Sequence, residues 1–245
     1  MYSRPGKIDF AQYRHIVVLT GAGVSAASGL QTFRGPGGLW TSGGDAEAAT
    51  LAGFREDPGR SWRLFGALRE AAQKARPNAA HRALAGAEEV APGAFTLVTQ
   101  NVDGLHRRAG NRTPVEIHGN VHRTRCSNEG CELAPYDDLT LFEDQASCAL
   151  CGAPLRPDVV LFDEPVPVDE EWAITRALRD CDLFVAVGTS GTVSPASNYV
   201  RGAAYVGART VFVNLEAMEP KNPAFQETYL GRAEELLPEL FASGR

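Results

Sequence analysis

The chain has 245 residues, of which 44% are hydrophobic and 22% are charged, and its formal net charge at pH 7 is −6. A chain of this length forms one or two domains and folds without disulfides, and its composition excludes disordered, collagen-like and coiled-coil proteins. The acidic balance argues against a general nucleic-acid binder. No apolar run reaches the ~20 residues of a membrane span, and no signal-peptide core follows Met1, so we expect a cytoplasmic protein.

Short apolar segments alternate with helical ones along the chain. The apolar segments cover residues 16–19, 95–98, 183–187 and 210–213, and the helical segments cover 61–75, 78–89, 169–179, 195–206 and 231–241. This alternation predicts an α/β fold with a doubly wound, Rossmann-like parallel sheet. Polar or glycine-rich residues follow each apolar segment, and the carboxyl ends of parallel strands are where such sheets bind ligands.

The first apolar segment runs into a glycine-rich motif, Gly21-x-Gly23-x-x-Ala26. Similar motifs let the backbone approach a pyrophosphate at a helix N-terminus, but they are also typical of a simple tight turn between strand and helix. Asp45 lies in a loop-like stretch, so Glu216, at the end of a later strand, is the better candidate for binding ribose hydroxyls.

Two stretches interrupt the alternation. Residues 35–59 are rich in Gly, Ala, Ser and Asp and predict a long loop with a short helix, and residues 119–158 hold four of the five cysteines. We therefore predict a larger domain formed by 1–34, 76–118 and 159–245, and a smaller inserted domain formed by 35–75 and 119–158.

Those four cysteines form two close pairs, Cys126 with Cys131 and Cys148 with Cys151. Such spacing presents four thiolates to one tetrahedral zinc ion, which leaves no open position for water, so the zinc would be structural. Two disulfides are the alternative, and they are rare in a reducing compartment. Cys181 opens an apolar strand and is expected to be an inert core thiol.

Taken together in chain order, the motifs resemble the sirtuins, which are NAD-dependent protein-lysine deacylases, and their wording is closest to bacterial members. The resemblance covers essentially the whole chain. Besides the cysteines, it is carried by Gly21-Ala22-Gly23-Val24-Ser25, Gly29-Leu30-x-x-Phe33-Arg34, Thr99-Gln100-Asn101-Val102-Asp103-Gly104-Leu105-His106, Ile117-His118-Gly119-Asn120, Val159-Val160-x-Phe162, Gly188-Thr189-Ser190 and Asn214-Leu215-Glu216.

The resemblance implies catalytic roles for three residues. His118 would be the general base that activates the nicotinamide-ribose hydroxyls, while Asn101 and Asp103 would bind the nicotinamide amide. Most lone histidines are core or capping residues, but the surrounding motifs argue against that role for His118. On the residues alone, Asn101 and Asp103 are equally typical of a turn without a ligand. His15, His81, His106 and His122 are expected to be structural or surface residues.

The resemblance also implies the binding residues, with the larger domain holding NAD. The implied cofactor residues are Gly21, Ala22, Gly23, Phe33, Arg34, Gln100, Asn101, Asp103, Gly188, Thr189, Ser190, Asn214, Glu216 and Arg232. The implied acyl-lysine residues are Val160, Phe162 and Val193, although ordinary core packing remains open for Val160. The partners would be proteins or peptides that carry acyl-lysine, with no nucleic acid or membrane.

Two positions depart from the family pattern. Asp163 stands where family members commonly have Gly, and a positive φ there would carry some cost. Desuccinylating members carry a Tyr and an Arg three residues apart, and a gapless placement between Trp62 and Pro77 puts Phe65 and Leu68 at those positions. Neither side chain can pair with a carboxylate, so the acyl pocket is expected to be apolar, unless Arg69 turns inward.

The sequence therefore predicts a protein-lysine deacetylase that consumes NAD and releases nicotinamide, the free lysine and O-acetyl-ADP-ribose. A mono-ADP-ribosyltransferase that uses the same site, and a non-catalytic module that senses NAD, are the alternatives.

Overall fold

The computed structural model describes residues 6–33, 38, 46–142, 145–191 and 193–241, and it contains two β-sheets. The larger sheet has six strands in the order β3-β2-β1-β7-β8-β9, and every neighbouring pair is parallel. Its strands are β1 (His15–Thr20), β2 (Ala94–Thr99), β3 (Val115–Glu116), β7 (Leu183–Val187), β8 (Arg209–Asn214) and β9 (Glu227–Leu230).

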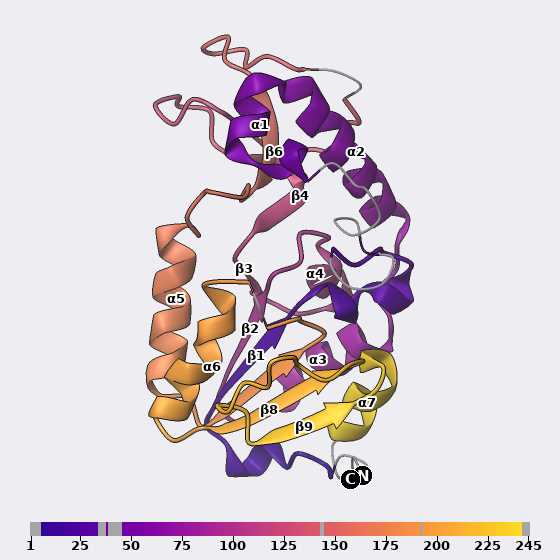
Figure 1. Cartoon of the computed structure of the whole chain (residues 1–245), viewed down its shortest axis with the longest axis vertical. Helices are drawn as coiled ribbons and strands as arrows, with labels where there is room; N and C mark the ends of the chain where they lie inside the picture. Colours follow the sequence, from indigo (N-terminus) through magenta and orange to yellow (C-terminus); the bar gives the residue numbers. More distant parts are fainter. Residues whose placement is uncertain (1–5, 34–37, 39–45, 143–144, 192, 242–245) are drawn as a thin grey trace.

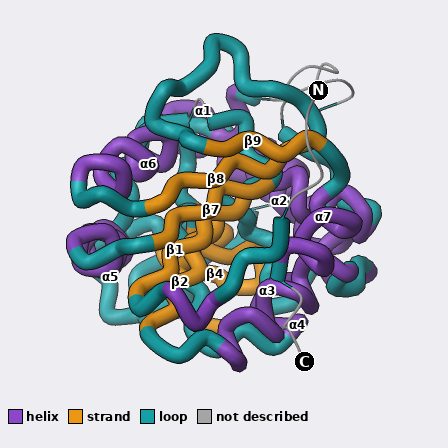
Figure 2. The backbone as a smooth tube through the Cα atoms, turned by 90° about the horizontal axis from the view of Figure 1, so that it is seen from below, coloured by secondary structure: helices purple, strands orange, loops and turns teal. Residues whose placement is uncertain are grey.

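Helices cover both faces of the larger sheet, as Figure 2 shows. Side chains alternate along each strand, so Ile16 and Val18 pack on one face and Val17 and Leu19 on the other. The first face carries α3 (Ala79–Val90) and α7 (Ala233–Leu240), and the second carries α5 (Val168–Arg179) and α6 (Ala196–Tyr205). The predicted doubly wound α/β sheet is confirmed.

The smaller sheet lies above the larger one in Figure 1 and is antiparallel. Its strands are β4 (Gly119–Cys126), β5 (Tyr136–Asp137) and β6 (Leu155–Val159), and it packs against α1 (Leu51–Glu56) and α2 (Pro58–Lys74). Trp62 of α2 is fully buried against Cys126, Cys148 and Leu155, and its Nε1–H donates to the Leu155 carbonyl at 2.9 Å. Helix α2 therefore packs against both longer strands of the smaller sheet, β4 and β6.

The predicted strands and helices match the observed ones to within a few residues. Helix α2 begins at Pro58 rather than at residue 61, because Asp57 caps it by accepting the Arg60 N–H at 2.9 Å and proline suits the first helical position. Strands β3 to β6, strand β9 and the short α4 (Leu105–Ala109) lie outside the predicted set. The division into two domains at the stated boundaries stays a prediction. No helix in the described ranges is both long and apolar enough to cross a membrane.

Candidate active site

A cavity of about 1260 Å³ opens at the carboxyl ends of the strands of the larger sheet and extends to the smaller sheet. The cavity is lined by the residues that follow strands β1, β2, β7 and β8. Because these strands are parallel, their carboxyl ends bring four polar or glycine-rich clusters together at one edge of the sheet. The clusters are Gly21–Gly23, Gln100 with Asn101, Gly188–Ser190 and Asn214–Glu216.

The two glycine-rich loops pack directly against each other at one wall of the cavity. A Cβ on Gly21 would lie 2.7 Å from the Gly188 carbonyl oxygen, and one on Gly23 would lie 2.8 Å from the Gly188 Cα. Gly188 itself has φ +60, which side chains disfavour. These glycines are therefore required by loop-to-loop packing, whether or not a phosphate also approaches them.

His118 and Gln100 occupy the middle of the cavity. The His118 Nδ1–H donates to the Gln100 carbonyl at 3.0 Å, so Nε2 is the nitrogen that keeps a lone pair. Burial lowers the pKa of His118 below its usual value, and the hydrogen bond to Gln100 only partly offsets that effect. The Gln100 side chain reaches across to β7 and donates to Thr189 Oγ1 at 2.9 Å. The arrangement presents a neutral imidazole with a free basic nitrogen.

Asn101 and Asp103 belong to a buried network organised by Ser25. The Ser25 hydroxyl donates to Asp103 Oδ2 at 2.7 Å and accepts from Asn101 Nδ2 at 3.2 Å. Burial raises the pKa of Asp103, whose other oxygen accepts the Leu105 N–H at 2.9 Å. Asn101 lines the cavity, whereas Asp103 lies behind it. The sequence reasoning left Ser25 out of the site, since only the fold brings it between these two side chains.

Two buried histidines continue this network. His81 caps its own helix, because its Nδ1 accepts the Asn78 N–H at 3.3 Å, while its Nε2 lies 3.4 Å from Ser25 Oγ. Its ring centroid is 4.9 Å from that of His106, whose Nε2 lies 2.9 Å from Thr20 Oγ1. Burial lowers the pKa of His81 to about 4 and that of His106 to about 3. The expected structural role of His81 holds, but its contact with Ser25 ties it to the candidate site.

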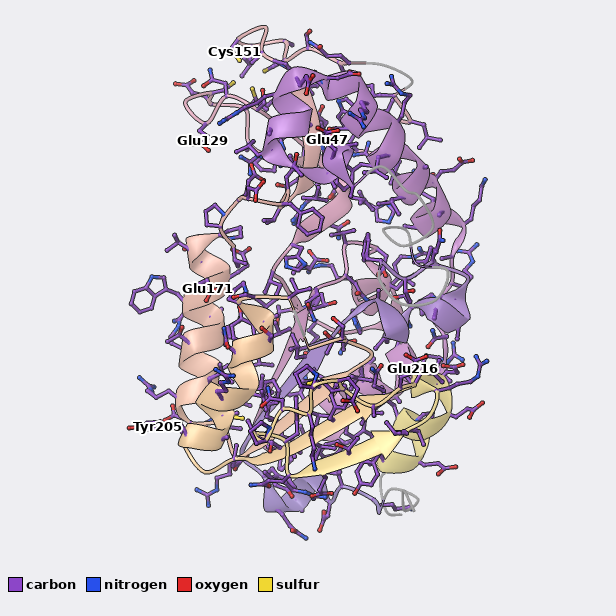
Figure 3. The ribbon with its side chains drawn as sticks, in the orientation of Figure 1. Glu47, Glu129, Cys151, Glu171, Tyr205 and Glu216 are labelled. Carbon is purple, nitrogen blue, oxygen red and sulfur yellow. The ribbon has the colours of Figure 1, made fainter. Side chains whose placement is uncertain are left out.

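The remaining predicted cofactor residues spread along the cavity. Phe33, Thr189 and Arg232 line it, and the exposed Glu216 lies near the N-terminus of α7 in Figure 3. Arg34 lies outside the described residues. The predicted contacts of these residues with a cofactor stay predictions.

The end of the cavity next to the smaller sheet is apolar. Phe65, Val160, Leu161 and Phe162 contribute to it, and Val193 also lines the cavity; the predicted contacts of these residues with an acyl-lysine stay predictions. Leu68 does not line it, because this half-buried side chain packs behind Phe65 in the apolar cluster of the smaller sheet.

Arg69 is turned away from the cavity and fully buried. Its Nε donates to the Val121 carbonyl at 2.6 Å, and its terminal nitrogens donate to the Thr140 carbonyl at 2.7 Å and to Thr124 Oγ1 at 3.0 Å. The guanidinium also stacks over Trp62 at 5.3 Å. Because its donors are used in this way, Arg69 supplies no cation to the apolar end of the cavity. The possibility that Arg69 turns inward, which the sequence left open, is therefore not what the structure shows.

Asp163 lies at the mouth of the apolar end. It is the only non-glycine residue of the described chain with a positive φ, at 72°. The Glu164 N–H donates to the Leu161 carbonyl at 3.1 Å, which makes Asp163 the third residue of a β-turn, where glycine or asparagine is preferred. The expectation that this position favours glycine therefore has a physical basis.

The four predicted metal ligands converge at the far end of the smaller sheet, and Figure 3 shows Cys151 well away from Glu216. All four sulfur atoms lie within 4.8 Å of one another, with Cys126 and Cys151 at 3.5 Å and Cys131 and Cys148 at 3.7 Å. Zinc–sulfur bonds of ~2.3 Å give tetrahedral edges of about 3.8 Å, so the cluster fits one zinc ion. The cysteines are not joined by disulfides.

The larger part of the cavity fits a dinucleotide on two observations. The Asn101 Oδ1 atom is buried and has no hydrogen-bond partner among the described residues, so it offers an acceptor to a carboxamide. The Ala22 N–H, at the start of a helical turn that lines the cavity, likewise donates to no described acceptor, as suits an anionic phosphate.

Comparison with known proteins gives consistent matches. The model of the Sir2 family matches residues 21–195. A curated relative from Salmonella typhimurium (strain LT2), named NAD-dependent protein deacylase, is 43% identical over 227 residues, which cover 91% of this chain and 81% of the relative. NAD-dependent protein deacylase 2 from Pyrobaculum aerophilum is 44% identical over 232 residues, covering 94% and 91%.

Solved structures agree with this match. The crystal structure of a Sir2 homologue in complex with NAD superposes with a TM-score of 0.87 at 32% identity, covering 98% of this chain and 95% of that one.

Proposed function

The chain belongs to the Sir2 family, and from that premise we propose that it is an NAD-dependent protein-lysine deacetylase. One observation carries the proposal. A neutral histidine with a free Nε2 lies in the same cavity as the buried, unpaired Asn101 oxygen and the apolar pocket around Phe65. A base, a dinucleotide site and an acyl site therefore meet in one enclosed space.

His118 acts as the general base. Its Nδ1–H bond to Gln100 fixes the tautomer and aims Nε2 as a proton acceptor, and its lowered pKa keeps the ring neutral at pH 7. When bound, NAD would supply the ribose carbon that the acyl oxygen attacks, the ribose hydroxyl that receives the acyl group, and nicotinamide as the leaving group. His118 removes a proton from a ribose hydroxyl at that stage, and much of the rate enhancement comes from holding the reactants in position.

Asn101 and Asp103 orient the nicotinamide end of the site. Asn101 Oδ1 accepts a carboxamide N–H, while its Nδ2 is held by the Gly21 carbonyl at 3.1 Å and by Ser25. Asp103 acts through Ser25 and the turn that it caps, because it lies behind the cavity wall. Asp103 is thus a positioning residue in this proposal.

The acyl pocket selects uncharged acyl groups. Phe65 forms its wall, and Arg69, the arginine nearest to it in sequence, is bound instead to the Val121 and Thr140 carbonyls. A succinyl carboxylate would lose its hydration in this pocket without gaining a partner. Acetyl-lysine carries no such charge and fits the pocket.

The zinc ion is structural. Four thiolates fill its coordination shell, and the cluster lies at the opposite end of the smaller sheet from the cavity. Zinc therefore holds the fold and takes no part in the reaction.

Mass spectrometry of the products formed from an acetyl-lysine peptide and NAD tests the proposal. The deacetylase produces free lysine peptide and O-acetyl-ADP-ribose in equal amounts, together with nicotinamide. An ADP-ribosylated protein or peptide with the acetyl group retained would replace the proposal with an ADP-ribosyltransferase. Binding of NAD without any product would replace it with a sensing module.

A further inference from the structure

The carboxylate of Asp163 stands unpaired at the mouth of the cavity. Asp163 is exposed, and no described residue donates a hydrogen bond to it or forms an ion pair with it. The two acidic side chains nearest in sequence on the same wall are engaged. Glu164 binds Arg156 through both oxygens at 2.6 and 2.8 Å, and Glu171 accepts the Tyr199 hydroxyl at 3.0 Å.

Backbone strain sets Asp163 apart from an ordinary surface carboxylate. The third position of its turn requires φ +72, which glycine adopts without cost and aspartate only at some cost. Residues held in disfavoured backbone conformations cluster at functional sites. Asp163 therefore places a carboxylate at a position where the backbone conformation alone favours glycine.

The surrounding charge makes the mouth attractive to cations. Six acidic residues line the described part of the cavity, and among the lysines and arginines only Arg232 does. Arg232 lies 3.5 Å from the Glu234 carboxylate, which reduces its field. The acidic lining residues are Asp163, Glu164, Glu171, Glu216, Glu219 and Glu234.

The path of the chain places Asp163 beside the substrate's backbone rather than its acyl group. The Val160 N–H donates to the His118 carbonyl at 2.9 Å, so this segment starts next to the base. Val159 and Leu161 then bury their side chains in the cluster with Phe65, while Phe162 and Asp163 are exposed. An acyl-lysine whose tip reaches Phe65 leaves its own backbone, and the residues on either side, at the mouth.

We propose that Asp163 is a specificity-determining residue that selects acyl-lysine sites flanked by lysine or arginine. This inference rests on the proposed deacetylase function. A cationic side chain next to the acyl-lysine gains an ion pair at a partly exposed site, which corresponds to about a two- to fivefold preference. The preference weakens as salt screens the pair.

The test compares three acetyl-lysine peptides whose two flanking residues are both Arg, both Ala or both Glu. For each protein variant, kcat/KM for the Arg and Glu peptides is divided by the value for the Ala peptide, so that a general change in activity cancels. Peptide affinity measured by fluorescence anisotropy without NAD gives the same ratios independently of turnover. The variants are Asp163→Asn, which removes the charge and tolerates positive φ, and Asp163→Gly.

Asp169→Asn is the matched control, because it removes one exposed carboxylate on the first turn of α5, outside the cavity lining. We expect the wild type and Asp169→Asn to prefer Arg over Ala and Ala over Glu, and both Asp163 variants to lose these preferences. Equal ratios in wild type and Asp163→Asn overturn the inference, even where deacetylation is normal. Absence of turnover on all peptides overturns the proposed function instead, and the anisotropy ratios then decide the inference alone.

Discussion

Burial of His118 determines the acid limb of the activity profile. Because the pKa of His118 is lowered by burial, the imidazole stays neutral to a pH below 6.5, and activity is lost only as the pH falls through that lowered value. We expect the acid-side midpoint of kcat/KM for an acetyl-lysine peptide to lie below pH 6.5. A midpoint at or above 6.5 would contradict the assignment of His118 as a buried base.

Removing that base gives a second test at the same position. His118→Ala is expected to lower deacetylation by about 10²- to 10⁴-fold while retaining much of the affinity for NAD and peptide, since a general base typically contributes that much. Single-turnover rates and calorimetric NAD binding are the measurements. His15→Ala is the control, because His15 is exposed at the amino end of β1. Comparable rates in the two variants would place the base elsewhere.

The buried pair His81 and His106 makes stability depend on pH. Both pKa values are lowered in the folded state by burial, so unfolding is favoured as the pH falls below the ordinary value near 6.5 toward 4 and 3. The lowered pKa of each histidine reduces the free energy of unfolding by about 2 kcal/mol when the pH falls from 7 to 5. The raised pKa of Asp103, caused by its burial, acts in the opposite direction.

Urea unfolding of the wild type and of His106→Gln at pH 7 and pH 5 measures this effect. The variant should lose less stability on acidification than the wild type. An identical pH dependence would mean that the pKa of His106 is the same in the folded and unfolded protein.

Helix α2 connects the acyl pocket to the zinc cluster through side chains one turn apart. Phe65 lines the cavity, Leu68 packs behind it, and Trp62 contacts Cys126 and Cys148. Positions three residues apart share one helix face, so an arginine at 68 would extend toward the pocket beside residue 65. We therefore expect substitutions in this helix to affect both the choice of acyl group and the stability of the smaller sheet.

Acyl choice can be read from matched acetyl and succinyl peptides. An unpaired buried carboxylate costs several kcal/mol, so the wild type should prefer acetyl-lysine by about 100-fold or more in kcat/KM. The double variant Phe65→Tyr, Leu68→Arg should raise desuccinylation and lower deacetylation, while Leu68→Met controls for repacking. A wild type with equal kcat/KM on both peptides would mean that the pocket holds a cation outside the described residues.

Loss of zinc should propagate along α2. Cys148→Ser leaves three thiolates without a complete metal site, so we expect zinc to be lost, hydrogen exchange to rise in β4, β6 and α2, and KM for the peptide to increase. Metal analysis and exchange mass spectrometry are the measurements. Cys181→Ser should keep one zinc per chain, because this buried thiol lies at the start of β7 and donates to the Leu183 carbonyl. A zinc-free Cys148→Ser with unchanged exchange would make the metal dispensable to the fold.

At the scale of the whole molecule, apolar periodicity predicted the inner strands but not the edges of the larger sheet. Strands β1, β7 and β8 are buried and rich in β-branched residues. Strand β9 has the sequence Glu-Thr-Tyr-Leu and β3 has only two residues, so the sequence of neither edge strand can be distinguished from that of a loop. Motif resemblance named many of the residues that line the cavity, but Leu68 and Asp103, which it also named, do not line it. Ser25 and the outward turn of Arg69 depend on contacts between segments more than 50 residues apart, which no local pattern encodes.

Because the cavity is walled by both sheets, NAD should protect distant segments together. Hydrogen exchange with and without NAD should show slower exchange at residues 21–33, 100–102 and 188–191, and no change in the cysteine segment 146–152. Protection confined to the cysteine segment would contradict the location of the cofactor site.

The backbone passes between the two sheets twice, from β3 through His118 to β4 and from β6 through α5 to β7. Any rotation of one sheet relative to the other would have to change the backbone of both connections. The His118 imidazole belongs to the first of these connections. The NMR signal of His118 should therefore respond to any change in the angle between the two sheets.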